Sequence, residues 1–421
     1  MLRRLLEVGQ GGIRVRPLGG SRAGEIRLGR FLRNRRVTPV EMIATATART
    51  AGLVRNRHIL VIQDTTSLRD DGDKRSLQLH PAIAVDAMDG ALLGLASATF
   101  LRRNGGQKKI HHNKRPFDEK ESRRWLDATR EAAQLAAAGA ACVTVIADRE
   151  GDIYEEFALR PAATELLIRV HHDRVLENGQ RLCSKTDGLP ELGRETISLP
   201  ATPGRPAREA VLALRACQVT LARPKRNRPA EARKLPPTVA LVLVEAQEIA
   251  PPAGVVPAHW RLLTTHAVNT LADARQITRF YRERWTIEQL FRVMKTKGFD
   301  IENVRMADET PFENLSAATL IAAIQVLQMV RDRDGTARRP LQDVFDLADQ
   351  PALEAVCATL EGKTAPQQNP HPKGSLAYAS WVCARLGGWT GYYRPPGPVV
   401  ILQGFLRFKA IHHGWTLGRL V

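Results

Sequence analysis

The sequence predicts an α/β protein with more than one domain. Two runs of consecutive aliphatic residues, in HILVIQDTTSL and ACVTVIADREGD, lack the alternation of a half-exposed strand. They therefore predict strands buried on both faces, as in a parallel sheet covered by helices. A strong helical pattern lies between these two runs, and a stretch of strand-like runs at 165–265 follows them. With 421 residues, the chain is long enough for two or three domains with a large core.

The first part of the chain alternates helices and strands. The first 28 or so residues carry little periodicity and are expected to be poorly ordered. VTPVEMIATATARTAGLV predicts a helix with Thr38 as its cap and Pro39 at its first position. LQLHPAIAVDAMDGALLGLASATF predicts two strands joined at MDG. EKESRRWLDATREAAQLAAAG predicts a helix closed by Gly139.

The second part changes from strands back to helices. Strands are predicted from four runs: ELLIRVHHDRVL, REAVLALRACQVTLARP, PTVALVLVEAQEI and HWRLLTTHAV. The segment TLADARQITRFYRERWTIEQLFRVMKTKG then predicts one continuous helix, and a second long helix begins near Pro311. A smaller C-terminal segment follows Arg331.

The charge balance favours a polyanionic partner. The chain has 62 Lys and Arg against 44 Asp and Glu, a net charge of +18. Neutralising phosphates releases counterions, so a basic surface of this kind is typical of nucleic-acid binding. The longest apolar run, LSAATLIAAIQVLQMV, is too short and too interrupted by polar residues to span a bilayer. Five scattered cysteines without a CxxC pair predict reduced core thiols in a cytoplasmic protein that has no membrane partner.

Three carboxylates stand where separate elements can bring them together. Asp64 and Asp148 follow the two buried strands, and functional groups gather at such strand ends. Glu288 lies on a later helix with an apolar face. Together they could hold two Mg²⁺ ions, which take oxygen ligands and promote phosphodiester displacement. An Asp at a strand end is more often a turn or helix cap, and that alternative stays open; Asp152 and Glu150 are interpreted as solvated or helix-capping residues.

The stretch YRERWTIEQLFRVMK combines different polar groups on one side of the predicted continuous helix. At about 100° per residue, Tyr281, Arg284, Glu288 and Lys295 share a stripe roughly 60° wide. A stripe that joins a carboxylate to a phenol, a guanidinium and an ammonium could hold a metal and phosphates together. Trp285 lies outside the stripe and is interpreted as a packing residue.

These residues and several further blocks resemble cut-and-paste DDE transposases of the insertion-sequence-four family, the relatives of bacterial transposon five. The spacing of Tyr281, Arg284, Glu288 and Lys295 is similar to that family's YREK signature. QDTTSL and ADREGDIYE resemble the blocks around its first two catalytic Asp residues. EKESRRWL, HWRLLTT and LGGWTGYYRPPGP resemble further blocks in the expected order, and the resemblance runs from about Gly29 to the end of the chain.

The resemblance implies a ribonuclease-H-like catalytic core with a mainly β insertion domain and a helical C-terminal domain. Asp64, Asp148 and Glu288 would be the catalytic metal ligands for two Mg²⁺ ions per site, with Mn²⁺ able to substitute. The implied reaction cleaves a transposon end by metal-dependent hydrolysis, forms and resolves a hairpin, and joins the freed 3′-hydroxyl to target DNA. The implied partners are double-stranded DNA (terminal inverted repeats and target) and a second copy of the chain in a homodimer, and the expected location is the nucleoid of a bacterial cytoplasm.

The resemblance also implies five DNA-binding residues. Tyr281, Arg284 and Lys295 would bind phosphates of the transposon end. Trp260 would stack on a base flipped out of the duplex near the cut. Arg169 aligns with a family Arg near the DNA.

The implied organisation has five segments: a shortened N-terminal DNA-binding region at 1–55, a first core part at 56–164, a β insertion at 165–265, a second core part at 266–331, and a helical dimerisation domain at 332–421. The family usually has a longer helical N-terminal domain that recognises the inverted repeat. Two other hypotheses therefore stay open. One is a catalytically incompetent DNA-binding or dimerising regulator, and the other is a ribonuclease-H-like nuclease without strand transfer.

Overall fold

The computed structural model describes residues 21–70, 75–104, 116–199, 206–224, 234–295, 298–306, 308–392 and 394–418. The chain divides into two compact units. Unit 1 comprises Met1–Arg55, Thr65–Gly105 and Thr286–Val421, and unit 2 comprises Asn56–Asp64 and Gly106–Trp285. The sequence also predicts a surface turn at RDDGDK (69–74) and a loop that could contact the DNA backbone from Arg223 to Lys234, and most of both segments lies outside the described residues.

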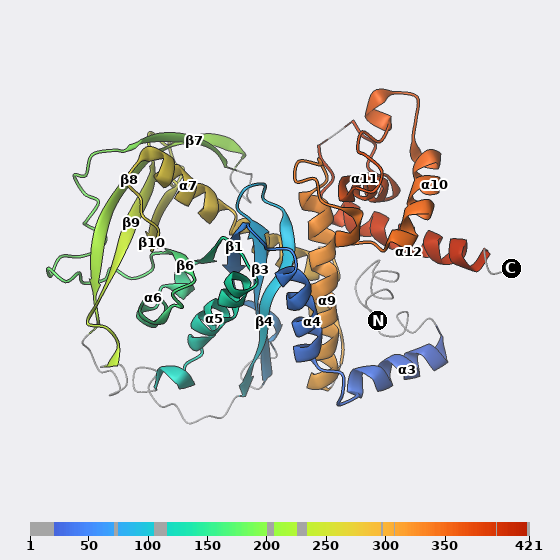
Figure 1. Ribbon diagram of the computed structural model, residues 1–421, viewed down its shortest axis with the longest axis horizontal. Helices are drawn as coiled ribbons and strands as arrows, with labels where there is room; N and C mark the ends of the chain where they lie inside the picture. The colour runs from blue at the N-terminus through green and yellow to red at the C-terminus, as the bar shows by residue number, and fades with distance from the viewer. Residues whose placement is uncertain are drawn as a thin grey trace. The chain divides into compact units, whose positions relative to one another are not determined.

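Unit 2 is built on a mixed sheet in the order β1-β5-β6-β10-β9-β8-β7 (Figure 1). Its strands are β1 (His58–Gln63), β5 (Cys142–Ala147), β6 (Glu165–Arg169), β7 (Gly193–Leu199), β8 (Arg208–Ala222), β9 (Thr238–Glu248) and β10 (His259–Thr264). β1, β5 and β6 are parallel, and the pairs from β6 to β7 are antiparallel. Its helices are α5 (Arg123–Ala137), α6 (Tyr154–Leu159) and α7 (Leu271–Arg282).

The interior of unit 2 follows from the aliphatic runs. All but the first residue of β1 and of β5 are buried, as expected for strands covered on both faces. α5 packs on these strands with a face that includes Trp125, Thr129 and Ala132. The four strands predicted at 165–265 are confirmed as β6, β8, β9 and β10, whereas β7 was not predicted. The helix predicted to close at Gly139 is confirmed as α5, with Gly139 at φ +100°.

Unit 1 joins an antiparallel set of strands to a group of helices. The strands are β2 (Thr66–Asp70), β3 (Arg75–Asp86) and β4 (Leu92–Asn104). The helices are α3 (Arg22–Arg33), α4 (Pro39–Ala51), α8 (Trp285–Met294), α9 (Glu309–Arg331), α10 (Gln350–Leu360), α11 (Leu376–Leu386) and α12 (Pro398–Gly418). α4 and α9 both pack on β4, and α3 lies against α9 (Figure 1).

The local predictions in unit 1 have mixed outcomes. The α4 start is confirmed, because Thr38 accepts a hydrogen bond from the Glu41 N–H and Pro39 is the first helical residue. The pair of strands joined at MDG is confirmed as β3 and β4. The expectation of poor order is wrong for residues 21–28, because α3 begins at Arg22, where the Ser21 hydroxyl accepts from the Gly24 N–H, and residues 1–20 lie outside the described part of the chain.

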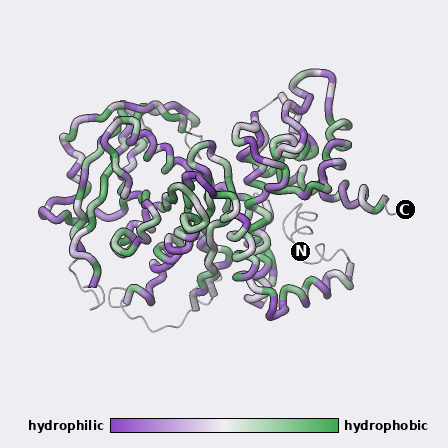
Figure 2. The backbone as a smooth tube through the Cα atoms, viewed as in Figure 1, coloured by the Kyte–Doolittle hydropathy of each residue, from purple (hydrophilic) through white to green (hydrophobic). Residues whose placement is uncertain are grey.

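α9 is the central helix of unit 1. By length and composition alone it is apolar enough to cross a membrane, which the sequence analysis did not recognise, but 89% of its most apolar window is buried inside the protein. Such burial is typical of a core helix. Figure 2 shows hydrophobic residues along α9 and along the packed strands. All five cysteines are free; Cys357 and Cys383 are buried and the other three are half-buried.

Candidate active site

Asp64 and Asp148 lie at the ends of adjacent parallel strands. In the register of β1 and β5, Ile62 is opposite Ile146, and each aspartate follows two residues later. Neighbouring strands are about 5 Å apart, so the two carboxylates leave the same edge of the sheet side by side. The structure therefore places Asp64 and Asp148 next to each other within unit 2.

The turn after β5 is closely packed against α5. A Cβ on Gly151 would lie 2.6 Å from the Ala147 Cβ and 3.3 Å from the Trp125 ring, so only glycine fits there without movement of its neighbours. Asp148 caps this turn by accepting a hydrogen bond from the Glu150 N–H at 2.8 Å. Glu150 itself is exposed and pairs with Arg124, which confirms the prediction that it is solvated.

The prediction of one continuous helix that carries the polar stripe is wrong. The chain forms α7 up to Arg282 and α8 from Trp285, and Glu283 and Arg284 form a turn between them. The Arg284 guanidinium lies 3.3 Å from the Asp64 carboxylate, with both side chains about one-sixth exposed. This long-range ion pair is a tertiary contact, which helical periodicity cannot reveal. Tyr281 thus belongs to α7 and Glu288 to α8.

Tyr281 of α7 lies close to Arg169 and Trp260. Tyr281 is buried, and burial raises the pKa of its phenol, while the charges of Arg284 and Arg169 oppose the rise. Trp260 is half-buried, and its ring centroid lies 6.0 Å from that of Tyr281. Four of the predicted DNA-binding residues, Arg169, Trp260, Tyr281 and Arg284, are therefore grouped in unit 2 with the two aspartates.

The orientation of Trp260 is fixed from the opposite face of β10. Its neighbours His259 and Arg261 both bond to Glu245 of β9, at 2.8 and 3.0 Å. Burial alone would raise the pKa of Glu245, but hydrogen bonds from His259 and Thr186 and the charge of Arg261 lower it to about 2. Because side chains alternate along a strand, the bonds at 259 and 261 direct Trp260 to the other face.

Glu288 and Lys295 belong to unit 1. Glu288 is half-buried in the first turn of α8. The Lys295 ammonium, just beyond α8, lies 2.8 Å from the Glu302 carboxylate. The predicted phosphate-binding lysine is therefore held in an ion pair with Glu302.

The oxygen donors of Asp64 and Asp148 suit a hard divalent cation, because such ions prefer carboxylate oxygens and retain water ligands. The two groups come from rigid neighbouring strands and stay partly accessible. Within the described residues, no group of three or more His, Cys, Asp and Glu side chains is arranged to hold a metal ion. Two carboxylates fit a hard divalent cation whose further ligands would be water and substrate oxygens.

A comparison with known families decides the identity of this part of the chain. The model of the transposase DDE domain matches residues 57–324, more than half of the chain. The chain belongs to this family. It is therefore a DDE transposase, an enzyme with polynucleotidyl transferase and endonuclease chemistry that acts on DNA. The mixed α/β structure is compatible with the ribonuclease-H-like fold of these enzymes, which generally use divalent metal ions.

The transposase also contains a buried clamp that sequence analysis missed. Asp152 is 1% exposed. Its carboxylate accepts hydrogen bonds from the His171 and His172 N–H groups at 2.8 and 2.9 Å and pairs with Arg174 at 2.7 Å. The prediction of a solvated or helix-capping role is wrong for Asp152, because this side chain joins the turn after β5 to the segment after β6. The only sequence signal was its place in ADREGD.

Trp285 also differs from its prediction. It was interpreted as a packing residue, but it is 41% exposed at the start of α8, next to Arg284. The residue that follows Arg284 in the sequence therefore carries a partly exposed aromatic side chain.

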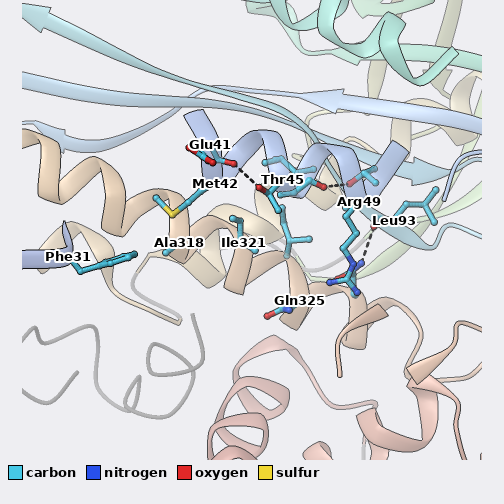
Figure 3. A pocket seen from close by; sticks show the side chains of 15 residues that line it. Phe31, Glu41, Met42, Thr45, Arg49, Leu93, Ala318, Ile321 and Gln325 are labelled. Carbon is cyan, nitrogen blue, oxygen red and sulfur yellow. Dashed lines mark hydrogen bonds between the residues drawn. The ribbon is translucent and has the colours of Figure 1, made fainter. Parts of the chain in front are cut away.

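A separate apolar cavity of about 400 Å³ lies in unit 1. Figure 3 shows Met42 of α4 and Ala318 and Ile321 of α9 on its wall, with Glu41 and Arg49 among the polar residues that line it. None of the predicted catalytic or DNA-binding residues lines this cavity. Its lining offers one carboxylate and no pair, so its chemistry does not suit metal-dependent cleavage.

Proposed function

We propose that this DDE transposase is a cut-and-paste enzyme of the insertion-sequence-four kind. It cleaves the ends of its own element, passes through a hairpin and joins the freed end to target DNA. The observation that carries the proposal is the grouping in unit 2 of a strand-end pair, Asp64 and Asp148, with cationic and aromatic side chains. Carboxylates for a metal and cations for phosphates are the two requirements of phosphodiester chemistry.

Asp64, Asp148 and Glu288 are proposed to hold two Mg²⁺ ions, for which Mn²⁺ can substitute. When bound, the ions would help to activate the attacking oxygen and to stabilise the leaving one. The protein supplies rigid placement: two carboxylates extend from a buried sheet, and Glu288 extends from a helix whose Ile287 and Leu290 are buried.

The surrounding side chains are proposed to bind the DNA strand. Arg284 and Arg169 suit bidentate contact with phosphate, and Lys295 suits a point-charge contact. Tyr281 is buried close to Arg169 and Arg284, so its hydroxyl would donate to a phosphate oxygen that these arginines hold. Trp260 offers a half-buried ring, oriented by Glu245, for a base that leaves the duplex. Stacking of this kind is worth about 1–3 kcal/mol per base.

The proposed partners are double-stranded DNA and a second copy of the chain. The net charge of +18 favours association with a polyanion. Cut-and-paste chemistry requires both ends of an element to be held together, and a homodimer would hold them.

The test is cleavage of a plasmid that carries the element's own two ends, in Mg²⁺ and in Mn²⁺. The wild-type protein is compared with Asp148→Asn and Glu288→Gln. Glu150→Gln serves as the matched control, because Glu150 lies two residues from Asp148 but has an exposed side chain, whose described ion pair is with Arg124. Products are resolved as nicked, hairpin, blunt-ended and joined DNA.

Metal-dependent hairpin and joined products from the wild type and Glu150→Gln, absent from the other two variants, would support the proposal. Cleaved DNA without joined product would instead indicate a nuclease. An intact plasmid together with a gel shift on the ends would indicate a DNA-binding regulator.

A further inference from the structure

Glu156 is a buried carboxyl group to which the proposed chemistry assigns no role. It lies on α6, eight residues after Asp148, and is 0% exposed. Its Oε1 accepts a hydrogen bond from the Thr129 hydroxyl at 2.5 Å. Its Oε2 has no hydrogen-bond partner among the described residues. A carboxyl group in such surroundings is costly to bury, so its place in the core needs a physical explanation.

The hydrogen bond from Thr129 is one step of a longer chain. The Gln63 side-chain amide donates to the same Thr129 hydroxyl oxygen at 3.2 Å, and all three residues are fully buried. They come from three elements: Gln63 ends β1, Thr129 lies in the middle of α5, and Glu156 lies in α6. These two hydrogen bonds therefore connect β1, which leads into Asp64, with α6, which follows Asp148.

The geometry at the end of β1 explains what this connection does. Gln63 directly precedes Asp64, and successive side chains on a strand point to opposite faces. Holding the Gln63 amide against α5 therefore fixes the rotation of the strand end from which Asp64 extends. The Thr129 hydroxyl also bonds to Glu156 of α6. One hydroxyl group therefore links the strand end that carries Asp64 to the segment that carries Asp148.

The electrostatics fit a neutral carboxyl at this point. Burial raises the pKa of Glu156 to about 7, against the hydrogen bond from Thr129 and the charge of Arg130, and the charge of Asp127 adds to the rise. A protonated Glu156 avoids the cost of an unpaired buried charge while keeping its bond to Thr129.

We propose that Gln63, Thr129 and Glu156 are positioning residues, whose hydrogen-bonded chain holds Asp64 and Asp148 at the spacing that binds a divalent cation. This inference rests on the proposed function, because it takes the two aspartates as metal ligands. Residues that orient metal ligands from behind are expected to affect metal affinity by about 10- to 100-fold when they are replaced.

The experiment measures Mn²⁺ binding to the full-length protein by the loss of the free-ion electron paramagnetic resonance signal. Thr129→Val removes both hydrogen bonds at nearly constant volume, and Thr129→Ser restores the hydroxyl. Thr278→Val is the matched control, because Thr278 is also a buried helical threonine in unit 2 that donates to a glutamate, Glu195, at 2.9 Å. Gln63→Met provides a second test if Thr129→Val does not fold, as judged by circular dichroism.

Mn²⁺ affinity is expected to fall about tenfold or more in Thr129→Val and to stay within about twofold of wild type in Thr129→Ser and Thr278→Val. Wild-type affinity in folded Thr129→Val or Gln63→Met would overturn the inference. So would an equal loss in Thr278→Val, because that would indicate a general loss of structure.

DNA cleavage by the same proteins separates this inference from the proposed function. If the variants show the expected Mn²⁺ affinities but the wild-type protein cleaves no DNA, the positioning role stands and the transposition proposal is refuted. A wild-type protein that binds no Mn²⁺, with or without DNA, would overturn both.

Discussion

Replacing Glu156 by glutamine removes a titrating group from the core and keeps its shape. Burial is the main reason that the pKa of Glu156 rises from 4.5 to about 7. In the unfolded chain this carboxyl loses its proton near pH 4.5, whereas in the folded protein it keeps the proton up to about pH 7. The stability it confers is therefore full below pH 4.5 and is lost as the pH rises through 7. The shift of 7 − 4.5, about 2.5 units, corresponds to about 3 kcal/mol at 1.36 kcal/mol per unit.

The glutamine variant does not titrate at this position, so its stability relative to wild type should grow by about 3 kcal/mol between pH 4.5 and pH 8. Native-state hydrogen exchange of the α5 and α6 amides at increasing urea measures the relevant free energy, because it reports the opening of this part of unit 2 rather than of the whole chain. Comparing variant with wild type at each pH cancels the titration of every other group. A difference that stays constant from pH 4.5 to 8 would refute the argument, and a difference that shrinks would reverse its sign.

Three further predictions concern the site itself. Asp152→Asn should destabilise unit 2 by about 3–5 kcal/mol in urea unfolding, because it leaves a buried arginine unpaired, whereas Glu150→Gln should change stability by less than about 1 kcal/mol. Trp260→Ala should reduce hairpin product about 5- to 150-fold, the equivalent of about 1–3 kcal/mol of base stacking, without reducing the first nick equally. Lys295→Gln should lower the salt dependence of DNA binding by about one phosphate contact, and Glu302→Gln should tighten binding at low salt, because it releases Lys295 from its ion pair.

The predictions that succeeded rest on local patterns. The aliphatic runs form β1 and β5, whose burial could be predicted from their own residues. The Thr38 cap with Pro39 acts within one turn of α4. Strand-end placement then brings Asp64 and Asp148 together, because parallel neighbours end at the same edge. The pairing of these two residues could therefore be predicted from two separate segments.

The predictions that failed depend on distant partners. The helical pattern around Arg284 is continuous in sequence, but the structure breaks it at Glu283 and Arg284, where the guanidinium pairs with Asp64, 220 residues away in the sequence. Asp152 carries no sequence mark that distinguishes a buried clamp from a solvated cap, since its partners lie after β6. Thr129 lies outside every block that resembles the family, and QDTTSL gives no sign of what Gln63 bonds to, so the hydrogen bond between these two residues was not predictable.

The Asp152 clamp and the hydrogen bonds among Gln63, Thr129 and Glu156 both constrain the segment that carries Asp148. Asp152 fixes the segment through Arg174, and Glu156 fixes it through Thr129. Asp64 is constrained in turn by Gln63 behind it and by Arg284 in front of it. A cation that binds Asp64 competes with Arg284 for the same carboxylate, since both need its oxygens. A cation at Asp64 and a phosphate at Arg284 would each weaken the attraction between these two side chains, so metal and DNA would favour each other's binding.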